Sequence, residues 1–321
     1  MTERAPIPER APPVQDWSAA PERSNALALK VMSWIALAGG RRAARAVLHP
    51  ITAYFLLTSP ALRRHLSRYL GRALGRPAGW RDLYRQCHAF AATVLDRVYL
   101  LRDRFDLFDL RVEGGEALQK LYERGEGAFL VGAHLGSFEA LRSAGRCAGS
   151  PPIAMLMYPD NARKINEALA AIAPDAAPRI IPLGRMEAML ELRDWLDAGG
   201  LAGMLADRTL PGDAARHASS SLTVPFLGRD AVFNDGPFRL AALLRRKVFF
   251  MAGLYLGGAR YEVRFLELAD FTERCRDAAE RDARLQAAVQ CYADTLAQLC
   301  REAPYNWFNF HDFWNEDGDA G

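Results

Sequence analysis

The chain has 321 residues, of which 50% are hydrophobic, and a formal net charge of +3 at pH 7. This length suits one large domain with an appendage, and the hydrophobic share is enough for a sizeable buried core. A net charge this small for the length argues against a nucleic-acid-binding protein, because the domains of such proteins are usually more basic.

Residues 1–24 are rich in proline and carry charges of both signs, which predicts a disordered tail. No apolar stretch follows a basic start, so the tail is not a secretory signal. Two apolar runs come next, at Ala26–Gly39 and Val47–Leu57, with arginines between them. Neither run reaches the roughly 20 residues that a bilayer core requires. We therefore expect two interface-seeking or re-entrant helices, with a buried helical hairpin as the open alternative.

Residues 25–104 are predicted to form a basic, amphipathic helical region that associates with a membrane. Within it, Ala61–Arg76 has the clearest helical periodicity. One face carries Arg64, Arg68, Arg72 and Arg76, and another carries Leu62, Leu66, Tyr69, Leu70 and Ala73. Such faces are typical of helices that lie in an anionic membrane surface. A helix packed on a core with a solvated basic face has the same pattern, so both interpretations stay open.

After Trp80–Arg102, a predicted helix, short apolar runs alternate with helical stretches, and we predict a catalytic domain over residues 105–315. The predicted strands are Ala128–His134, Ile153–Tyr158, Arg179–Leu183 and Leu201–Asp207; the helices between them are Phe138–Gly145, Ala162–Ile172 and Met186–Asp197. This alternation favours an α/β fold with a mostly parallel central sheet flanked by helices. A hairpin of Val248–Tyr255 and Tyr261–Leu268 follows, then a long helix at about Arg276–Glu302 and a mobile acidic tail at 316–321.

The most informative motif is GAHLGSFE at residues 132–139. A buried strand is predicted to run into His134, a glycine turn follows, and a helix begins near Ser137, a residue type suited to cap it. Ligands of open α/β sheets bind at the carboxyl ends of the strands, where His134 lies. Glu139 falls in the first turn of the helix, and we expect its carboxylate to approach the imidazole from there.

A histidine beside a carboxylate suits acyl transfer to a hydroxyl. The hydroxyl must lose its proton as it attacks a thioester carbonyl, and an imidazole, with an ordinary pKa of about 6.5, suits this task. The carboxylate fixes the tautomer of the imidazole and stabilises the imidazolium that forms, so no nucleophilic Ser or Cys is required. A purely structural hydrogen bond between His134 and Glu139 is the alternative.

Metal chemistry has little support in the sequence. The other histidines show no metal-binding spacing such as HExxH, and the five cysteines include no CxxC pair. We therefore expect no metal and no cofactor, and the odd number of cysteines also argues against a disulfide framework.

The motif resembles the histidine–four residues–acidic block of the lysophospholipid acyltransferase superfamily. The chain is similar in particular to bacterial lipid A late acyltransferases and their predicted relatives. LADR at 205–208, VPFLG at 224–228 and DGPF at 235–238 resemble the second block of that family, in the same order. PYNWFNFHDFW at 304–314 resembles its aromatic ending. The resemblance covers nearly the whole chain, although the polar residue common before the histidine is here Ala133.

The resemblance implies a lysophospholipid acyltransferase-like α/β domain in which His134 is the general base and Glu139 its orienting partner. Asp207 and Arg208 match the strand-end block of the family. Arginine there suits contact with a phosphate, a headgroup or the developing oxyanion, and a buried Asp–Arg pair that holds the next loop is the alternative. Gly236 begins a helix whose free N–H groups suit an anion. Ser137 completes the expected substrate-binding residues.

We therefore expect a membrane-associated O-acyltransferase that moves a fatty acyl group from an acyl carrier protein or coenzyme A thioester to a hydroxyl of a lipid or glycolipid precursor, lipid A-like or related. We expect the protein to lie on the cytoplasmic face of the cell inner membrane as a peripheral or monotopic protein. We expect no nucleic-acid partner. The alternatives are a non-catalytic lipid-binding or scaffold protein and an acyl-thioester or lipid hydrolase.

Overall fold

The computed structural model describes residues 26–147, 151–158, 179–208 and 221–314, with side chains from residue 39 onward except at 144–147. Its centre is a seven-stranded sheet in the order β1-β9-β8-β2-β5-β3-β4. The strands are β1 (Asp109–Glu113), β2 (Ala128–Gly136), β3 (Ile153–Met157), β4 (Arg179–Pro182), β5 (Leu201–Leu205), β8 (Lys247–Tyr255) and β9 (Arg260–Asp270). Neighbouring strands are parallel except β8 and β9. The predicted α/β class with a mostly parallel sheet is confirmed.

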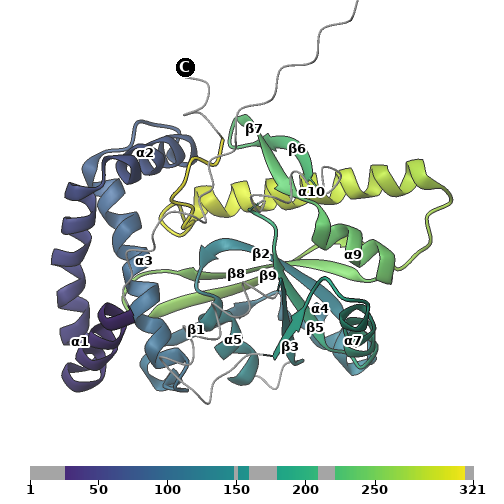
Figure 1. Ribbon diagram of the computed structural model, residues 1–321, viewed down its shortest axis with the longest axis horizontal. Helices are drawn as coiled ribbons and strands as arrows, with labels where there is room; N and C mark the ends of the chain where they lie inside the picture. Colours follow the sequence, from purple (N-terminus) through teal and green to yellow (C-terminus); the bar gives the residue numbers. More distant parts are fainter. Residues whose placement is uncertain (1–25, 148–150, 159–178, 209–220, 315–321) are drawn as a thin grey trace, which may run out of the picture.

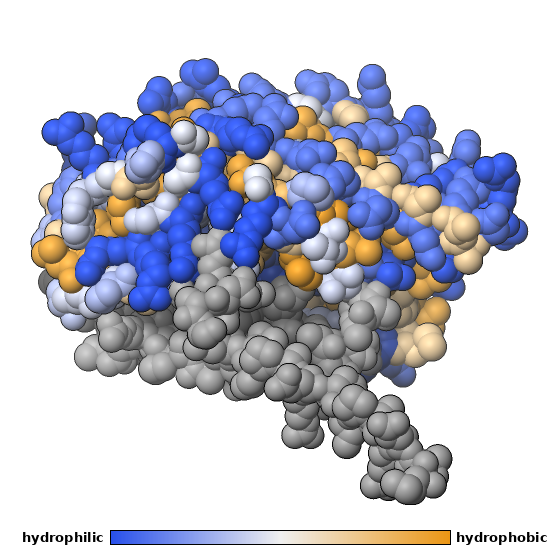
Figure 2. Space-filling view, turned by 90° about the horizontal axis from the view of Figure 1, so that it is seen from above, coloured by the Kyte–Doolittle hydropathy of each residue, from blue (hydrophilic) through white to orange (hydrophobic). Residues whose placement is uncertain are grey.

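Helices cover both faces of this sheet (Figure 1). They are α4 (Gly115–Glu123), α5 (Phe138–Cys147), α7 (Met186–Asp197), α9 (Gly236–Leu244) and α10 (Ala278–Glu302). Because strand side chains alternate between faces, Phe129 and Val131 of β2 join one core with α7, α9 and α10. Ala128 and Leu130 join another with α4 and α5. Seen from above, the outer surface is largely hydrophilic with apolar side chains interspersed (Figure 2).

Some elements were not predicted from the sequence. They are β1, α4, a short 3-10 helix at Phe105–Leu107, and a separate antiparallel hairpin of β6 (Ser221–Phe226) and β7 (Arg229–Asn234). The hairpin packs against α10 and contributes Phe226 and Phe233 to the larger core. The predicted helix Ala162–Ile172 and both predicted tails lie outside the described residues.

Three helices precede the sheet: α1 (Ala26–Thr58), α2 (Pro60–Leu74) and α3 (Trp80–Leu100), seen on the left in Figure 1. α1 is broken at Gly40, whose φ of 73° is non-helical, so the arginines expected between two helices belong to the second part of α1. Among the helices that the structure places, none combines the length and apolar composition needed to cross a bilayer.

The apolar face of α2 packs inside the chain. Leu66, Tyr69, Leu70 and Ala73 are buried, and Tyr69 and Leu70 belong to the same core as the sheet. Of the two interpretations that the periodicity left open, the structure matches a helix packed on a core. The helical region and the sheet therefore share a hydrophobic core.

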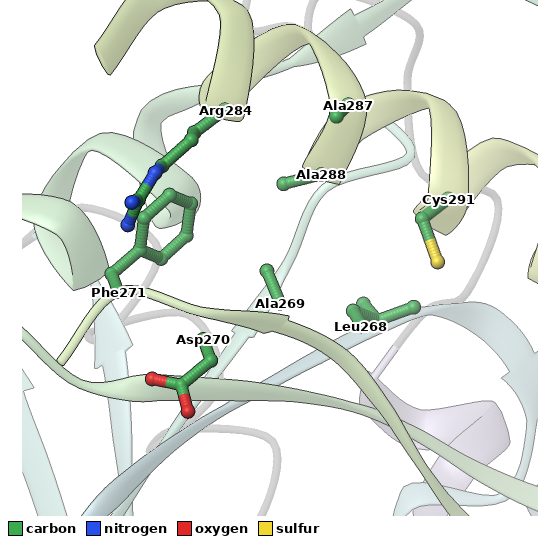
Figure 3. A pocket seen from close by; sticks show the side chains of 8 residues that line it. All are labelled: Leu268, Ala269, Asp270, Phe271, Arg284, Ala287, Ala288 and Cys291. Carbon is green, nitrogen blue, oxygen red and sulfur yellow. The ribbon is translucent and has the colours of Figure 1, made fainter. Parts of the chain in front are cut away.

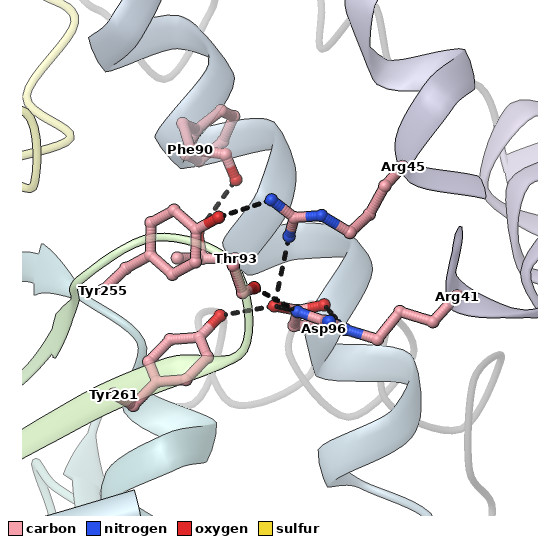
Figure 4. A network of polar contacts seen from close by, with 8 residues as sticks. Arg41, Arg45, Phe90, Thr93, Asp96, Tyr255 and Tyr261 are labelled. Carbon is pink, nitrogen blue, oxygen red and sulfur yellow. Dashed lines mark hydrogen bonds and ion pairs between the residues drawn. The ribbon is translucent and has the colours of Figure 1, made fainter. Parts of the chain in front are cut away.

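A buried ionic network fastens α1 and α3 to the β8–β9 hairpin (Figure 4). Asp96 of α3 is fully buried and accepts hydrogen bonds from Arg41 Nε and Nη2 at 2.8 Å each. Tyr261 of β9 donates to Asp96 Oδ2 at 2.8 Å, and Arg45 donates to the Tyr255 hydroxyl at 2.6 Å. Burial, followed by the charge of Asp96, raises the pKa of Tyr261 far above its usual value, so its phenol stays a donor.

Replacing Asp96 with asparagine is expected to lower the free energy of unfolding by about 3 kcal/mol, because Arg41 and Arg45 would keep their charges in a largely buried place without a counter-charge. Urea unfolding measures this effect. The matched control is Asp106→Asn, which removes the partner of Arg104 from an exposed pair and should destabilise the protein far less, because solvent screens such a pair. Equal losses for the two variants would contradict the role of the network.

Candidate active site

The pairing of β2 with β5 places His134 beside Asp207. Gly132 of β2 is opposite Leu205 of β5. Two residues further along each strand, at the carboxyl edge of the sheet, come His134 and Asp207. Ala206 N–H donates to the Gly132 carbonyl at 3.1 Å, which continues the ladder up to this pair. Two residues that are 73 positions apart in the sequence thereby become neighbours.

A bulge turns His134 out of the regular ladder. Gly132 pairs with Met251 of β8, but the next pair is Gly136 with Gly253, so β2 uses four residues where β8 uses two. Bulges of this kind re-aim side chains next to active sites. Gly136 has a φ of 74°, and a Cβ atom there would lie 2.0 Å from the Gly253 carbonyl oxygen. The glycine of the motif is therefore required by this close approach of β2 and β8.

His134 and Asp207 form a hydrogen-bonded dyad. His134 Nδ1 lies 2.9 Å from Asp207 Oδ1, and the His134 backbone N–H donates to Asp207 Oδ2 at 2.9 Å. The carboxylate is fully buried, while 31% of the imidazole is exposed. In a neutral imidazole, a carboxylate beside Nδ1 favours the tautomer with the proton on that atom, which leaves Nε2 as the nitrogen that can accept a proton.

Asp207 is ionised despite its burial. Burial raises the pKa of its carboxyl group, but the charge and hydrogen bond of His134, the charge of Arg208 and the His134 backbone N–H outweigh it and bring the pKa to about 2. A buried carboxylate that stays charged needs such partners. The dyad thus has the electrostatics of a histidine base with an acidic orienting residue.

The prediction that Glu139 orients His134 is wrong. Arg97 of α3 lies 2.7 Å from Glu139 Oε1, and Ser137 Oγ donates to Oε2 at 3.4 Å. The dyad carboxylate belongs to Asp207 instead. Glu139 lies in the first turn of α5. The guanidinium of Arg97 on the neighbouring helix offsets the cost of burying its charge. Its contacts give Glu139 the role of joining α5 to α3.

Two other groups that were predicted to bind substrate are hydrogen-bonded to residues of the protein itself. Ser137 is buried and its Oγ accepts the Ala140 N–H at 3.2 Å, which is the N-cap predicted for α5. The Gly236 N–H donates to Asn234 Oδ1 at 2.9 Å, so it is not free for an anion as predicted. Asp235, beside it, is buried and bonded to Arg239.

Arg208 does lie at the site. It follows Asp207 directly, and its Nη2 is 3.5 Å from the Phe308 carbonyl oxygen. Burial lowers the pKa of its guanidinium, and the charge of Asp207 opposes that effect. Of the predicted site residues, the structure brings together His134, Asp207 and Arg208, and it separates Glu139, Ser137 and Gly236 from the dyad hydrogen bonds.

The contact of the C-terminal segment, residues 305–314, with the dyad carboxylate was not predicted from the sequence. Trp307 pairs with Leu135 in an isolated bridge, and its indole Nε1–H donates to Asp207 Oδ2 at 3.0 Å. His311 is close enough that the charges of Arg208, Asp207 and His134 act on it, and burial first and Arg208 second lower its pKa to about 4. The aromatic ending was visible in the sequence, but its place beside His134 was not.

A hollow of about 400 Å³ lies elsewhere, between α10 and the end of β9 (Figure 3). Its lining includes Ala269 and Cys291. Ala269 pairs with Val248, which pairs with Phe129 at the beginning of β2. The hollow is therefore at the opposite end of the strands from His134, and it has no part in the dyad.

Comparisons with known proteins leave the family open. No protein-family model matches the chain, and no curated protein is significantly similar to it. Within the described ranges, no group of three or more His, Cys, Asp or Glu side chains is arranged to hold a metal ion. The geometry of the dyad and the motif residues are therefore the observations that bear on function.

Proposed function

We propose that the protein is a membrane-associated O-acyltransferase that moves a fatty acyl group from an acyl carrier protein or coenzyme A thioester to a hydroxyl of a lipid or glycolipid precursor. The observation that carries the proposal is the His134–Asp207 dyad, with a buried carboxylate, a partly exposed imidazole and its Nε2 directed away from Asp207. In the part of the chain that the structure describes, no Ser or Cys is hydrogen-bonded to that imidazole.

This geometry suits direct attack by the acceptor. Nε2 of His134 takes the hydroxyl proton while the oxygen forms a bond to the thioester carbonyl carbon. The tetrahedral intermediate then loses the thiolate as the C–S bond breaks, and the imidazolium returns its proton to the sulfur. Asp207 stabilises the imidazolium between these steps. We assign Arg208 to the developing oxyanion or to an anionic group of the substrates, because a guanidinium offers a rigid set of donors.

The motif residues that resemble lysophospholipid acyltransferases support this assignment by their positions. His134, Asp207 and Trp307 come from three separate parts of the sequence, yet Asp207 is hydrogen-bonded both to the His134 imidazole and to the Trp307 indole. Phe226, from the VPFLG part of the second block, packs on Trp307 with ring centroids 5.4 Å apart. If these distant blocks build one active site, that explains why all of them resemble the same family.

The test is to incubate the purified chain with lipid vesicles and a labelled acyl thioester, either of the carrier protein or of coenzyme A, and to identify the products by mass spectrometry. The proposal predicts an acyl ester on a lipid hydroxyl. Labelled free fatty acid as the only product would instead indicate the hydrolase. Thioester turnover no faster than the uncatalysed rate with any lipid tested would favour the non-catalytic lipid-binding protein.

The membrane contact is assigned to a corner where α1, α2 and α3 meet. The corner patch, defined as Tyr54, Phe55, Leu57 and Trp80, consists of large apolar side chains that are exposed. Arg63 binds the Leu56 and Leu57 carbonyls and lies 5.7 Å from the Trp80 ring centroid, so it connects the two sides of the patch. Arg64 and Arg81, which follow Arg63 and Trp80 directly in the sequence, are exposed. Aromatic and basic side chains together suit an anionic membrane surface.

Replacing Leu57 and Trp80 together with glutamate is expected to weaken binding to vesicles of phosphatidylglycerol and phosphatidylcholine by at least about tenfold, because the change removes apolar area and adds charge of the wrong sign. A vesicle flotation assay measures the effect. The control replaces Met186 and Leu243, two equally exposed apolar residues on α7 and α9, with glutamate. If the control loses as much binding as the corner variant, the assignment of the membrane contact is wrong.

A further inference from the structure

The C-terminal segment is held in place from both sides of the candidate site. The Phe308 N–H donates to the His134 carbonyl at 2.7 Å, so the segment continues the backbone pairing of β2 where the bulge leaves it. From the other side, His65 Nδ1 bonds the Phe310 carbonyl at 3.1 Å. Arg68 Nη1 of α2 lies 3.6 Å from Asp312 Oδ1 of the segment. The basic face of α2 therefore anchors the segment that carries Trp307.

Trp307 is the most constrained residue of this segment. Its side chain is fully buried, with ring centroids 4.9 Å from both Tyr69 and Phe313. Aromatic packing on several sides fixes the plane of the indole. The direction in which the Nε1–H can donate is therefore fixed as well. The acceptor is Asp207 Oδ2, 3.0 Å from the Trp307 Nε1 atom.

The two oxygens of Asp207 have different partners. Oδ2 accepts the His134 backbone N–H and the Trp307 indole N–H, while Oδ1 faces His134 Nδ1. A carboxylate held through one oxygen by two donors cannot rotate without breaking both bonds. A hydrogen bond to a charged group stabilises more than one between neutral groups. Where the group is buried, water cannot replace a hydrogen bond that is lost.

We propose that Trp307 is a positioning residue of the active site, whose indole N–H holds the Asp207 carboxylate in the orientation that aims Oδ1 at the imidazole. Trp307 does not touch the reacting atoms; it acts through Asp207. This inference rests on the proposed function for its kinetic consequence, whereas the orientation of the dyad is a separate property of the folded protein.

The sharpest variant replaces Trp307 with 3-benzothienylalanine, which keeps the bicyclic shape and exchanges only the N–H for sulfur. The matched control is the same replacement at Trp314. That tryptophan is buried in the same aromatic cluster, 6.2 Å from Trp307 between ring centroids, and its Nε1 has no hydrogen-bond partner among the described residues. Thermal unfolding verifies that both variants are folded, and Trp307→Phe serves as a second variant.

Two readouts separate positioning from a general structural role. The first is the downfield proton NMR signal of His134 Nδ1–H, assigned with His134→Gln and recorded at low temperature to slow exchange. We expect it in the unsubstituted protein and in the Trp314 control, and we expect it shifted or broadened in the Trp307 variants. The second is kinetic: kcat should fall about 10- to 100-fold at position 307 with KM changed less than about threefold, and neither should change at position 314.

An NMR signal and a kcat at position 307 equal to those of the Trp314 control would overturn the proposal, as would the absence of the signal from the unsubstituted protein. If the unsubstituted protein transfers no acyl group, the proposed function fails, and the NMR comparison alone then decides whether Trp307 positions the carboxylate.

Discussion

Replacing His134 with alanine is expected to lower kcat/KM for acyl transfer by at least about 10². The imidazole is the group that accepts the hydroxyl proton, and in the described structure its Nδ1 is already engaged by Asp207, which leaves Nε2 for this task. Without it, the hydroxyl must attack while it keeps its proton or gives it to water. Thioester consumption in the presence of the lipid acceptor measures the effect.

The control for this variant is His49→Ala, which removes an exposed imidazole on α1 that is bonded to Tyr84. Its rate should stay within about twofold of the unsubstituted protein, because it lacks a carboxylate partner at a strand end. Vesicle binding by both variants should be unchanged. A His134→Ala protein that keeps more than about a third of the original rate would refute the assignment of the base.

The second large effect is expected for Asp207→Asn, which should lower kcat by about 10² to 10⁴ with a much smaller change in KM. Asparagine retains the shape of the side chain, but it removes the negative charge that stabilises the imidazolium. Its amide N–H can also favour the wrong tautomer, with the proton on Nε2, and that tautomer is not a base at the reacting position. Steady-state kinetics at saturating donor measures the loss.

Glu139→Gln is the matched comparison, since it neutralises the carboxylate that belongs to the motif itself. We expect it to change kcat by less than about fivefold. It should reduce the free energy of unfolding by about 1 kcal/mol, a modest value because Arg97 is partly exposed. A larger loss of kcat for Glu139→Gln than for Asp207→Asn would show that the first-turn glutamate, and not Asp207, serves the histidine.

The position of the base was predictable from the sequence because it depends on local patterns. A buried apolar run, a glycine and a capping serine place His134 at the end of β2. The partner of the base was not predictable, because it depends on which strands are neighbours. β5 follows β4 in the sequence but pairs with β2, and only this pairing puts Asp207 opposite His134.

Sequence periodicity also could not decide what α2 packs against. An apolar stripe opposite a basic one describes both a membrane-surface helix and a helix on a core. In the structure the apolar residues of α2 are buried, and its basic residues include Arg68, which reaches Asp312. Trp307 illustrates the same limit, since its partner Asp207 is 100 residues away in the sequence.

An imidazole oriented by a carboxylate is proposed to let an acceptor hydroxyl attack the thioester directly. The most direct measurement mixes the protein with an equimolar acyl thioester and follows thiol release together with the intact mass of the protein. We expect thiol release only when the hydroxyl-bearing lipid is present, with no acyl mass on the protein at any time. A burst of thiol without the acceptor, accompanied by an acylated protein, would instead show a covalent acyl-enzyme and rule out direct attack by the hydroxyl.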